Sequence, residues 1–356
     1  MDNNLLCMDV INRVESNCLD ICFPPPMYFS HHVATSLSII MANNENKDWF
    51  YNNFIQATFY NDFANIGSGH LYGIYPAMET RLRHFAASQY LMETCINLNI
   101  LNLMSDRLCE NVKLFIDNGY YVSCVADVSR LKGTRYAQRD FFSHRIMIFG
   151  YDFKSHTLDI LDFDHKQALN KIKVMMDDFL DAFYSERLCA QLNGHKNNTL
   201  VLYERKTRPF TADFGLVREA LSDYLNSYNS SKRYSLILPC DECSSWGIAT
   251  YAKMVEYLNS VPEKSEGIDI RMAHAFYEHK KIMYDRFEYF AARKIYSTEN
   301  KIRKQLESNV RIAEIIRLLV IKYNQTKDVK IISTIINKLK DIEEAEKYLY
   351  KKLLES

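Results

Sequence analysis

The stretch from Gly119 to Asp164, GYYVSCVADVSRLKGTRYAQRDFFSHRIMIFGYDFKSHTLDILDFD, decides the fold of this chain. It predicts a buried strand over Tyr120–Asp127, then a polar loop, a second strand that opens on His144 and a third that closes on Asp162. Gly150-Tyr151-Asp152 indicates a turn between the last two strands. Because these strands are expected to be antiparallel neighbours, His144 and Asp162 should lie close together. A carboxylate in that position orients an imidazole for general-base catalysis.

The composition limits the class of protein. A chain of 356 residues suggests two domains, and 44 basic against 44 acidic residues favours neither nucleic acid nor an anionic membrane as a partner. Nine irregularly spaced cysteines indicate reduced thiols. The N-terminus MDNNLLCMDV lacks the pattern of a signal peptide, and no apolar run approaches the roughly 18 residues of a membrane span. We expect a soluble, cytoplasmic protein.

Elsewhere the hydrophobic periodicity predicts one more strand and a series of helices. A helix is expected after Ser30, which is a suitable N-cap, and a strand over Thr199–Glu204. Further helical patterns cover 77–103, 167–183, 214–228, 246–258, 272–296 and two segments within 306–354. The last two suit either a helical hairpin or a homodimer interface. The fold class is therefore α+β, with a mainly antiparallel sheet in residues 1–205 and a mostly helical region over 206–356.

The candidate nucleophile for the His144 and Asp162 pair is a cysteine. A reactive thiol is normally placed at a helix N-terminus, but the first helix begins Ser30-His31-His32. Cys18 and Cys22 lie upstream, and Cys18 is the default choice. Asp152 and Asp164 are alternative partners of His144, although both have the pattern of turn residues.

Three further groups are weaker candidates. The adjacent His31 and His32 would point in different directions on a helix, so no shared metal ion is expected. The loop Gly67–Gly73 offers backbone amides to an oxyanion or phosphate. Cys240 and Cys243 form a CxxC motif without a second pair of ligands for zinc.

Several of these features resemble one known family. They are the glycine loop, the strand GYYVSCVAD, the segment HRIMIFGYD with Asp162 downstream, Trp246-Gly247-Ile248 and His279-Lys280-Lys281 followed by Arg286. Together they resemble the papain-like family named after the N-terminal domain of the butirosin-biosynthesis acyltransferase, over residues 28–295. The resemblance implies a papain-like cysteine-peptidase-type fold and a role in thiotemplated or nonribosomal peptide assembly.

The resemblance also implies site residues. His144 matches the family's catalytic histidine and Asp162 its orienting acid, whereas His32 stands where the family has its cysteine. The resulting catalytic set is Cys18, His144 and Asp162, with His32 and Gly69 as substrate-binding candidates and no metal ion.

The expected function is transfer of an acyl or peptidyl group from a carrier-protein thioester to a small amine. No cofactor is required, and the substrate would be presented on a phosphopantetheine arm. The alternative is a non-catalytic family member that binds a carrier protein or a peptide product.

Overall fold

The computed structural model describes residues 15–65, 70–75, 89–98, 100–101, 107–194, 198–236, 240–262, 267–294 and 300–355. The chain divides into two compact units, one of residues 1–43 and 88–208, the other of residues 44–87 and 209–356. The long C-terminal segment of the second unit begins at residue 209, close to the domain boundary at 205 that the sequence predicts. Residues 44–87 also belong to it, although the sequence analysis assigned them to the first domain. The reason is pairing, because two strands from this segment form a sheet with a strand near residue 245.

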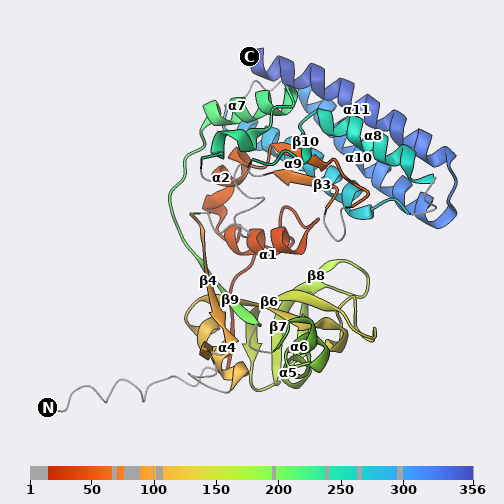
Figure 1. The fold of residues 1–356 in the computed structure, drawn as a ribbon. Helices are drawn as coiled ribbons and strands as arrows, with labels where there is room; N and C mark the ends of the chain where they lie inside the picture. The colour runs from red at the N-terminus through yellow and green to blue at the C-terminus, as the bar shows by residue number, and fades with distance from the viewer. Residues whose placement is uncertain are drawn as a thin grey trace. The chain divides into compact units, whose positions relative to one another are not determined.

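In the described part of the first unit, seven strands form one antiparallel sheet (Figure 1). Its order is β4-β9-β5-β6-β7-β8, and β1 pairs with the end of β6. The strands are β1 Ser16–Cys18, β4 Leu91–Asn97, β5 Tyr120–Asp127, β6 Ser143–Asp152, β7 Thr157–Phe163, β8 Leu169–Met175 and β9 Thr199–Arg205. This unit therefore has the α+β, mainly antiparallel architecture that the sequence predicts.

The described part of the first unit contains four α-helices, two of which supply buried side chains to the core of this sheet. The four helices are α1 His31–Ile40, α4 Leu108–Asp117, α5 Met176–Phe183 and α6 Glu186–Gln191, with the short 3-10 helix η2 Val128–Arg130. Apolar side chains of α4 and α5 pack against alternate residues of β5, β6 and β7, such as Val122, Ile146 and Ile160. Apolar residues alternate along these strands and so share one face of the sheet, and burial of that face stabilises the central sheet.

Three local predictions in this unit are wrong. The segment Leu91–Asn97 is strand β4 and not part of a helix over 77–103, of which residues 77–88, 99, 102 and 103 lie outside the described residues. The helix expected over 167–183 begins only at Met176, after strand β8. Gly150-Tyr151-Asp152 is not a turn, because β6 continues through it after a register shift between Ile148 and Gly150. In each case pairing with a neighbouring strand overrides the local pattern.

The second unit combines a small sheet with long helices (Figure 1). Strands β10 Ser244–Trp246, β2 Gln56–Tyr60 and β3 Tyr72–Tyr75 form the sheet in that order. The helices are α2 Lys47–Asn52, α7 Phe214–Leu225, α8 Ala249–Ser260, α9 Ile270–Ala292, α10 Asn300–Thr326 and α11 Lys330–Glu355, with 3-10 helices η1 Asn44–Asn46 and η4 Ser230–Tyr234. Helices α10 and α11 pack against one another, as the hairpin alternative predicts. A dimer through them stays a prediction.

A buried ion pair joins four helices of this unit. The ammonium group of Lys280 on α9 lies 2.8 and 2.9 Å from the two carboxylate oxygens of Glu346 on α11, and both residues are at most 1 % exposed. The same carboxylate accepts hydrogen bonds from the hydroxyl groups of Tyr224, Tyr251 and Tyr350. All of its lone pairs are thereby directed at donors, which is the condition for burying a charge.

Candidate functional site

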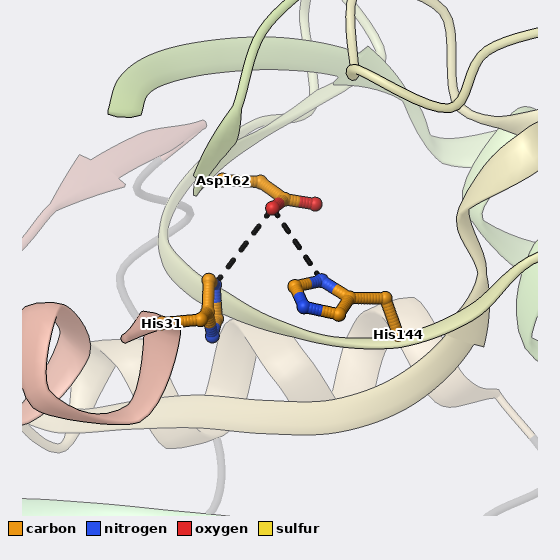
Figure 2. A group of neighbouring side chains, drawn as sticks. All are labelled: His31, His144 and Asp162. Carbon is orange, nitrogen blue, oxygen red and sulfur yellow. Dashed lines mark ion pairs between the residues drawn. The ribbon is translucent and has the colours of Figure 1, made fainter. Parts of the chain in front are cut away.

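Three side chains from separate parts of the first unit converge on one point (Figure 2). His31 is the first residue of α1, His144 lies at the start of β6 and Asp162 lies near the end of β7. The Oδ1 atom of Asp162 is 3.5 Å from Nδ1 of His144 and 3.9 Å from Nε2 of His31. The two imidazole rings are 4.8 Å apart between centroids, at 69°. The carboxylate thus lies between two histidines.

The position of Asp162 relative to His144 follows from strand register. Strands β6 and β7 pair antiparallel with Ile148 opposite Ile160, so the start of β6 lies beside the end of β7. Asp162 is 2 % exposed, and its Oδ1 accepts a hydrogen bond of 2.7 Å from the backbone amide of Phe163. The side chain of His144 is 27 % exposed. This arrangement places a buried carboxylate beside a partly exposed imidazole, the two groups that a general base oriented by an acid requires.

His31 is held in place by the helix and by the sheet. It follows the N-cap Ser30, and its Nε2 donates a hydrogen bond of 3.2 Å to the carbonyl oxygen of Leu161 on β7. Burial lowers the pKa of His31 from 6.5 to about 4; the charge of Asp162 opposes this change, and His144 adds to it. The ring is therefore neutral near pH 7, with its proton on Nε2.

Among the residues that the structure describes, none provides a hydrogen-bond partner for three buried polar atoms at this point. They are Nδ1 of His31, Nδ1 of His144 and Oδ2 of Asp162. Nδ1 of His144 and Oδ1 of Asp162 are close enough for an ion pair, but their geometry is not that of a hydrogen bond. Each unpaired buried group costs about 1–3 kcal/mol, and such groups usually find partners in folded proteins. Their concentration at one point makes this cluster the candidate functional site.

Cys18 does not belong to this cluster, which corrects the catalytic set expected from the sequence. It lies on β1 opposite Gly150 of β6, six residues along that strand from His144. Six residues of strand span about 20 Å, which is far beyond the reach of a hydrogen bond. Burial is the largest of the effects that raise the pKa of the Cys18 thiol, followed by the nearby charge of Asp159. Cys18 is thus distant from the base and is not an activated thiolate.

The other cysteine candidates are also elsewhere. The amide of Cys22 donates to the carbonyl of Ser38, seven residues or about 10 Å along α1 from His31. Burial raises the pKa of Cys124, inside the core, to about 12. Cys240 lies in the second unit, where its sulfur contacts Asn229 and Ser231. None of these three thiols lies at the histidine pair.

The remaining candidates have structural roles or fall outside the description. Asp152 accepts hydrogen bonds from the amides of Lys154 and Ser155, and Asp164 from those of Lys166 and Ala168, so both stabilise turns. Gly69 lies outside the described residues. The ring of His32 is 6.3 Å from that of His31 and is not part of the cluster.

His31 is a site residue that the sequence indicates only as one of an adjacent pair, of which His32 is the one assigned to the site. The structure places His31, and not His32, opposite the His144 and Asp162 pair, at the N-terminus of the helix where a thiol was sought. The signal was available, because His31 directly follows the predicted N-cap Ser30. Adjacent histidines share no face of a helix, so the sequence could not decide which one turns inward.

None of the described helices is long and apolar enough to span a bilayer. No protein-family model and no curated protein matches the chain.

Proposed function

We propose that this protein transfers an acyl or peptidyl group from a carrier-protein thioester directly to an amine, with His144 as the general base. The observation that carries the proposal is the partly exposed His144 with the buried Asp162 behind it. The resemblance to the papain-like acyltransferase family supports the choice of substrates. The partner is then an acyl or peptidyl carrier protein with its thioester on a phosphopantetheine arm.

Direct transfer needs no thiol at the cluster, whose members among the described residues are His31, His144 and Asp162, and it agrees with a histidine, His32, at the position where the resemblance implies a cysteine. The amine nitrogen attacks the thioester carbonyl carbon, so a C–N bond forms and the C–S bond breaks. His144 takes the proton from the attacking nitrogen and gives it to the leaving sulfur. Asp162 stabilises the imidazolium formed between these steps. Because burial keeps the pKa of His31 low, that ring adds no second positive charge beside it.

A second function is favoured by the same substitution. A histidine at the place of the nucleophile is also what a non-catalytic relative would show, and such a protein would bind the loaded carrier without turnover. The two functions differ in whether His144 changes the rate of amide formation.

The test uses N-acetylcysteamine thioesters of acetate and of amino acids as small mimics of the loaded arm, with a panel of primary amines. Thiol release and amide formation are followed in wild type, in His144→Ala and Asp162→Asn, and in two controls. The controls are Cys18→Ala and His156→Ala; His156 is an exposed histidine paired with Asp177. We expect His144→Ala to lower the rate about 10²–10⁴-fold and both controls to keep it. Loss of activity in Cys18→Ala, or an acyl adduct on any cysteine, would refute direct transfer.

If wild type forms no amide with any amine, the loaded carrier itself is tested by native mass spectrometry. A stable complex without product would replace the catalytic function with the binding function.

A further inference from the structure

The same three side chains have the donor set and spacing of a metal site. One nitrogen of His31, one nitrogen of His144 and one carboxylate oxygen of Asp162 all lie within 4.8 Å of one another. We propose that these three residues bind a divalent transition-metal ion, with Zn²⁺ as the best fit. Among the residues that the structure describes, this is the one group of histidine, cysteine and acidic side chains with such spacing.

The distances suit a small ion. Zinc binds imidazole nitrogen and carboxylate oxygen at about 2.0–2.2 Å, which puts neighbouring donors of a tetrahedral site roughly 3.3 Å apart. Oδ1 of Asp162 is already 3.5 Å from Nδ1 of His144 and 3.9 Å from Nε2 of His31. These two distances exceed the tetrahedral value by only about 0.2 and 0.6 Å. Three protein donors leave the fourth position of a tetrahedral ion open.

The unpaired atoms give an independent reason. In the described part of the chain, Nδ1 of both histidines and Oδ2 of Asp162 are buried without a hydrogen-bond partner, and His31 and Asp162 are more than nine-tenths buried. A cation at this point would supply the interaction that these lone pairs lack.

The surroundings have the form of an outer shell. His31 donates from Nε2 to the Leu161 carbonyl, and Asp162 accepts from the Phe163 amide, and contacts of this kind hold metal ligands in orientation. The ligand atom of His31 is then either the unpaired Nδ1 or, if the bond to Leu161 exchanges, Nε2. One nearby group opposes a cation, because the Arg145 guanidinium acts electrostatically on His31.

Metal binding would have a consequence for the reaction proposed above. An ion held by Nδ1 of His144 and by Asp162 removes the carboxylate that orients the base, so Zn²⁺ would inhibit acyl transfer. This consequence rests on the proposed function, whereas the binding itself does not.

The experiment measures binding without any activity assay. Tag-free protein is stripped with a chelator, titrated with Zn²⁺ against a chromophoric chelator, and separately loaded with Co²⁺ for visible absorption spectra. The variants are His31→Gln, His144→Ala and Asp162→Asn, with His156→Ala as the matched control and circular dichroism as a check of folding.

We expect one Zn²⁺ per chain in wild type and in His156→Ala. Each of the three cluster variants should bind Zn²⁺ at least about 100-fold more weakly, because the loss of even an outer contact to a metal ligand lowers metal affinity about 10–100-fold. Tetrahedral Co²⁺ bands should appear in wild type and vanish in the folded Asp162→Asn variant. Fewer than about 0.2 Zn²⁺ per wild-type chain, or equal binding by wild type and the folded variants, would overturn the inference. Either outcome leaves the thioester assay on metal-free protein as a separate test of acyl transfer.

Discussion

The buried pair of Lys280 and Glu346 gives the sharpest test of how the second unit is held together. Substituting Lys280→Met removes the ammonium group from a carboxylate that is inaccessible to water, while the three tyrosine hydroxyl groups around Glu346 remain. Burial lowers the pKa of Lys280, and the charge of Glu346 and its hydrogen bond oppose that change. Breaking a buried pair from one side costs about 3–5 kcal/mol, because the remaining charge is left uncompensated.

The magnitude follows from the contacts. Lys280 donates to both carboxylate oxygens and to the Tyr224 hydroxyl, and hydrogen bonds to charged groups contribute about 1.5–3 kcal/mol each. The three tyrosines hold part of the negative charge, so we expect a loss of about 4 kcal/mol. With a urea m-value of about 2 kcal/mol/M, the unfolding midpoint should fall by about 2 M.

The assay can be confined to this unit. The two tryptophans of the chain, Trp49 and Trp246, both lie in the second unit, so intrinsic tryptophan fluorescence reports its unfolding. The matched control is Lys281→Met, because Lys281 is an exposed neighbour paired only with Asp285 on the surface; it should change stability by less than about 1 kcal/mol. The double variant Lys280→Met/Glu346→Gln should lose less than the two single variants together. If Lys280→Met matches Lys281→Met in midpoint, the pair does not stabilise this unit and the reasoning fails.

Three further predictions concern the cluster and two close backbone contacts. In metal-free protein, burial lowers the pKa of His31 from 6.5 to about 4. The neutral form of His31 therefore stabilises the fold above pH 6.5. This contribution, roughly 3 kcal/mol, is lost as the pH falls from 6.5 towards 4. Thermal unfolding by circular dichroism should therefore depend less on pH between 7 and 4.5 in His31→Gln than in wild type, and equal slopes would contradict the assignment. Gly150→Ala should weaken the pairing of β1 with β6, because a Cβ there would lie 3.1 Å from the carbonyl oxygen of Asn17 and 3.2 Å from Cα of Cys18. Hydrogen exchange should become faster at the Leu19 amide and stay unchanged at the Ile146 amide. Gly247→Ala should lower the free energy of unfolding of the second unit by at least about 2 kcal/mol, because the φ of Gly247 is +55° and a Cβ there would lie 2.1 Å from the Tyr224 carbonyl oxygen. A free energy of unfolding, measured by tryptophan fluorescence, within about 0.5 kcal/mol of wild type would contradict this.

The amino-acid sequence by itself determined the elements whose partners are close in the chain. Strand β5 has the predicted bounds Tyr120–Asp127, and α1 begins directly after its predicted cap Ser30. The strands that begin near His144 and end near Asp162 also form as expected. These segments carry their own signals, because alternation, capping and the order of consecutive hairpins depend on neighbours in sequence.

Only the tertiary structure decided the features that depend on distant partners. Leu91–Asn97 begins with three residues that favour helices, Leu91, Met92 and Glu93, but it forms a strand because it pairs with β9, more than a hundred residues later. His31 enters the cluster because its ring contacts the carbonyl oxygen of Leu161 near the end of β7. Cys18 lies outside the cluster because it is paired with Gly150, six residues along β6 from His144. Which of two adjacent histidines is buried, and which lysine finds Glu346, are matters of three-dimensional packing. Local propensity carries no information about them, since the free energy that selects them arises only when distant side chains are brought together.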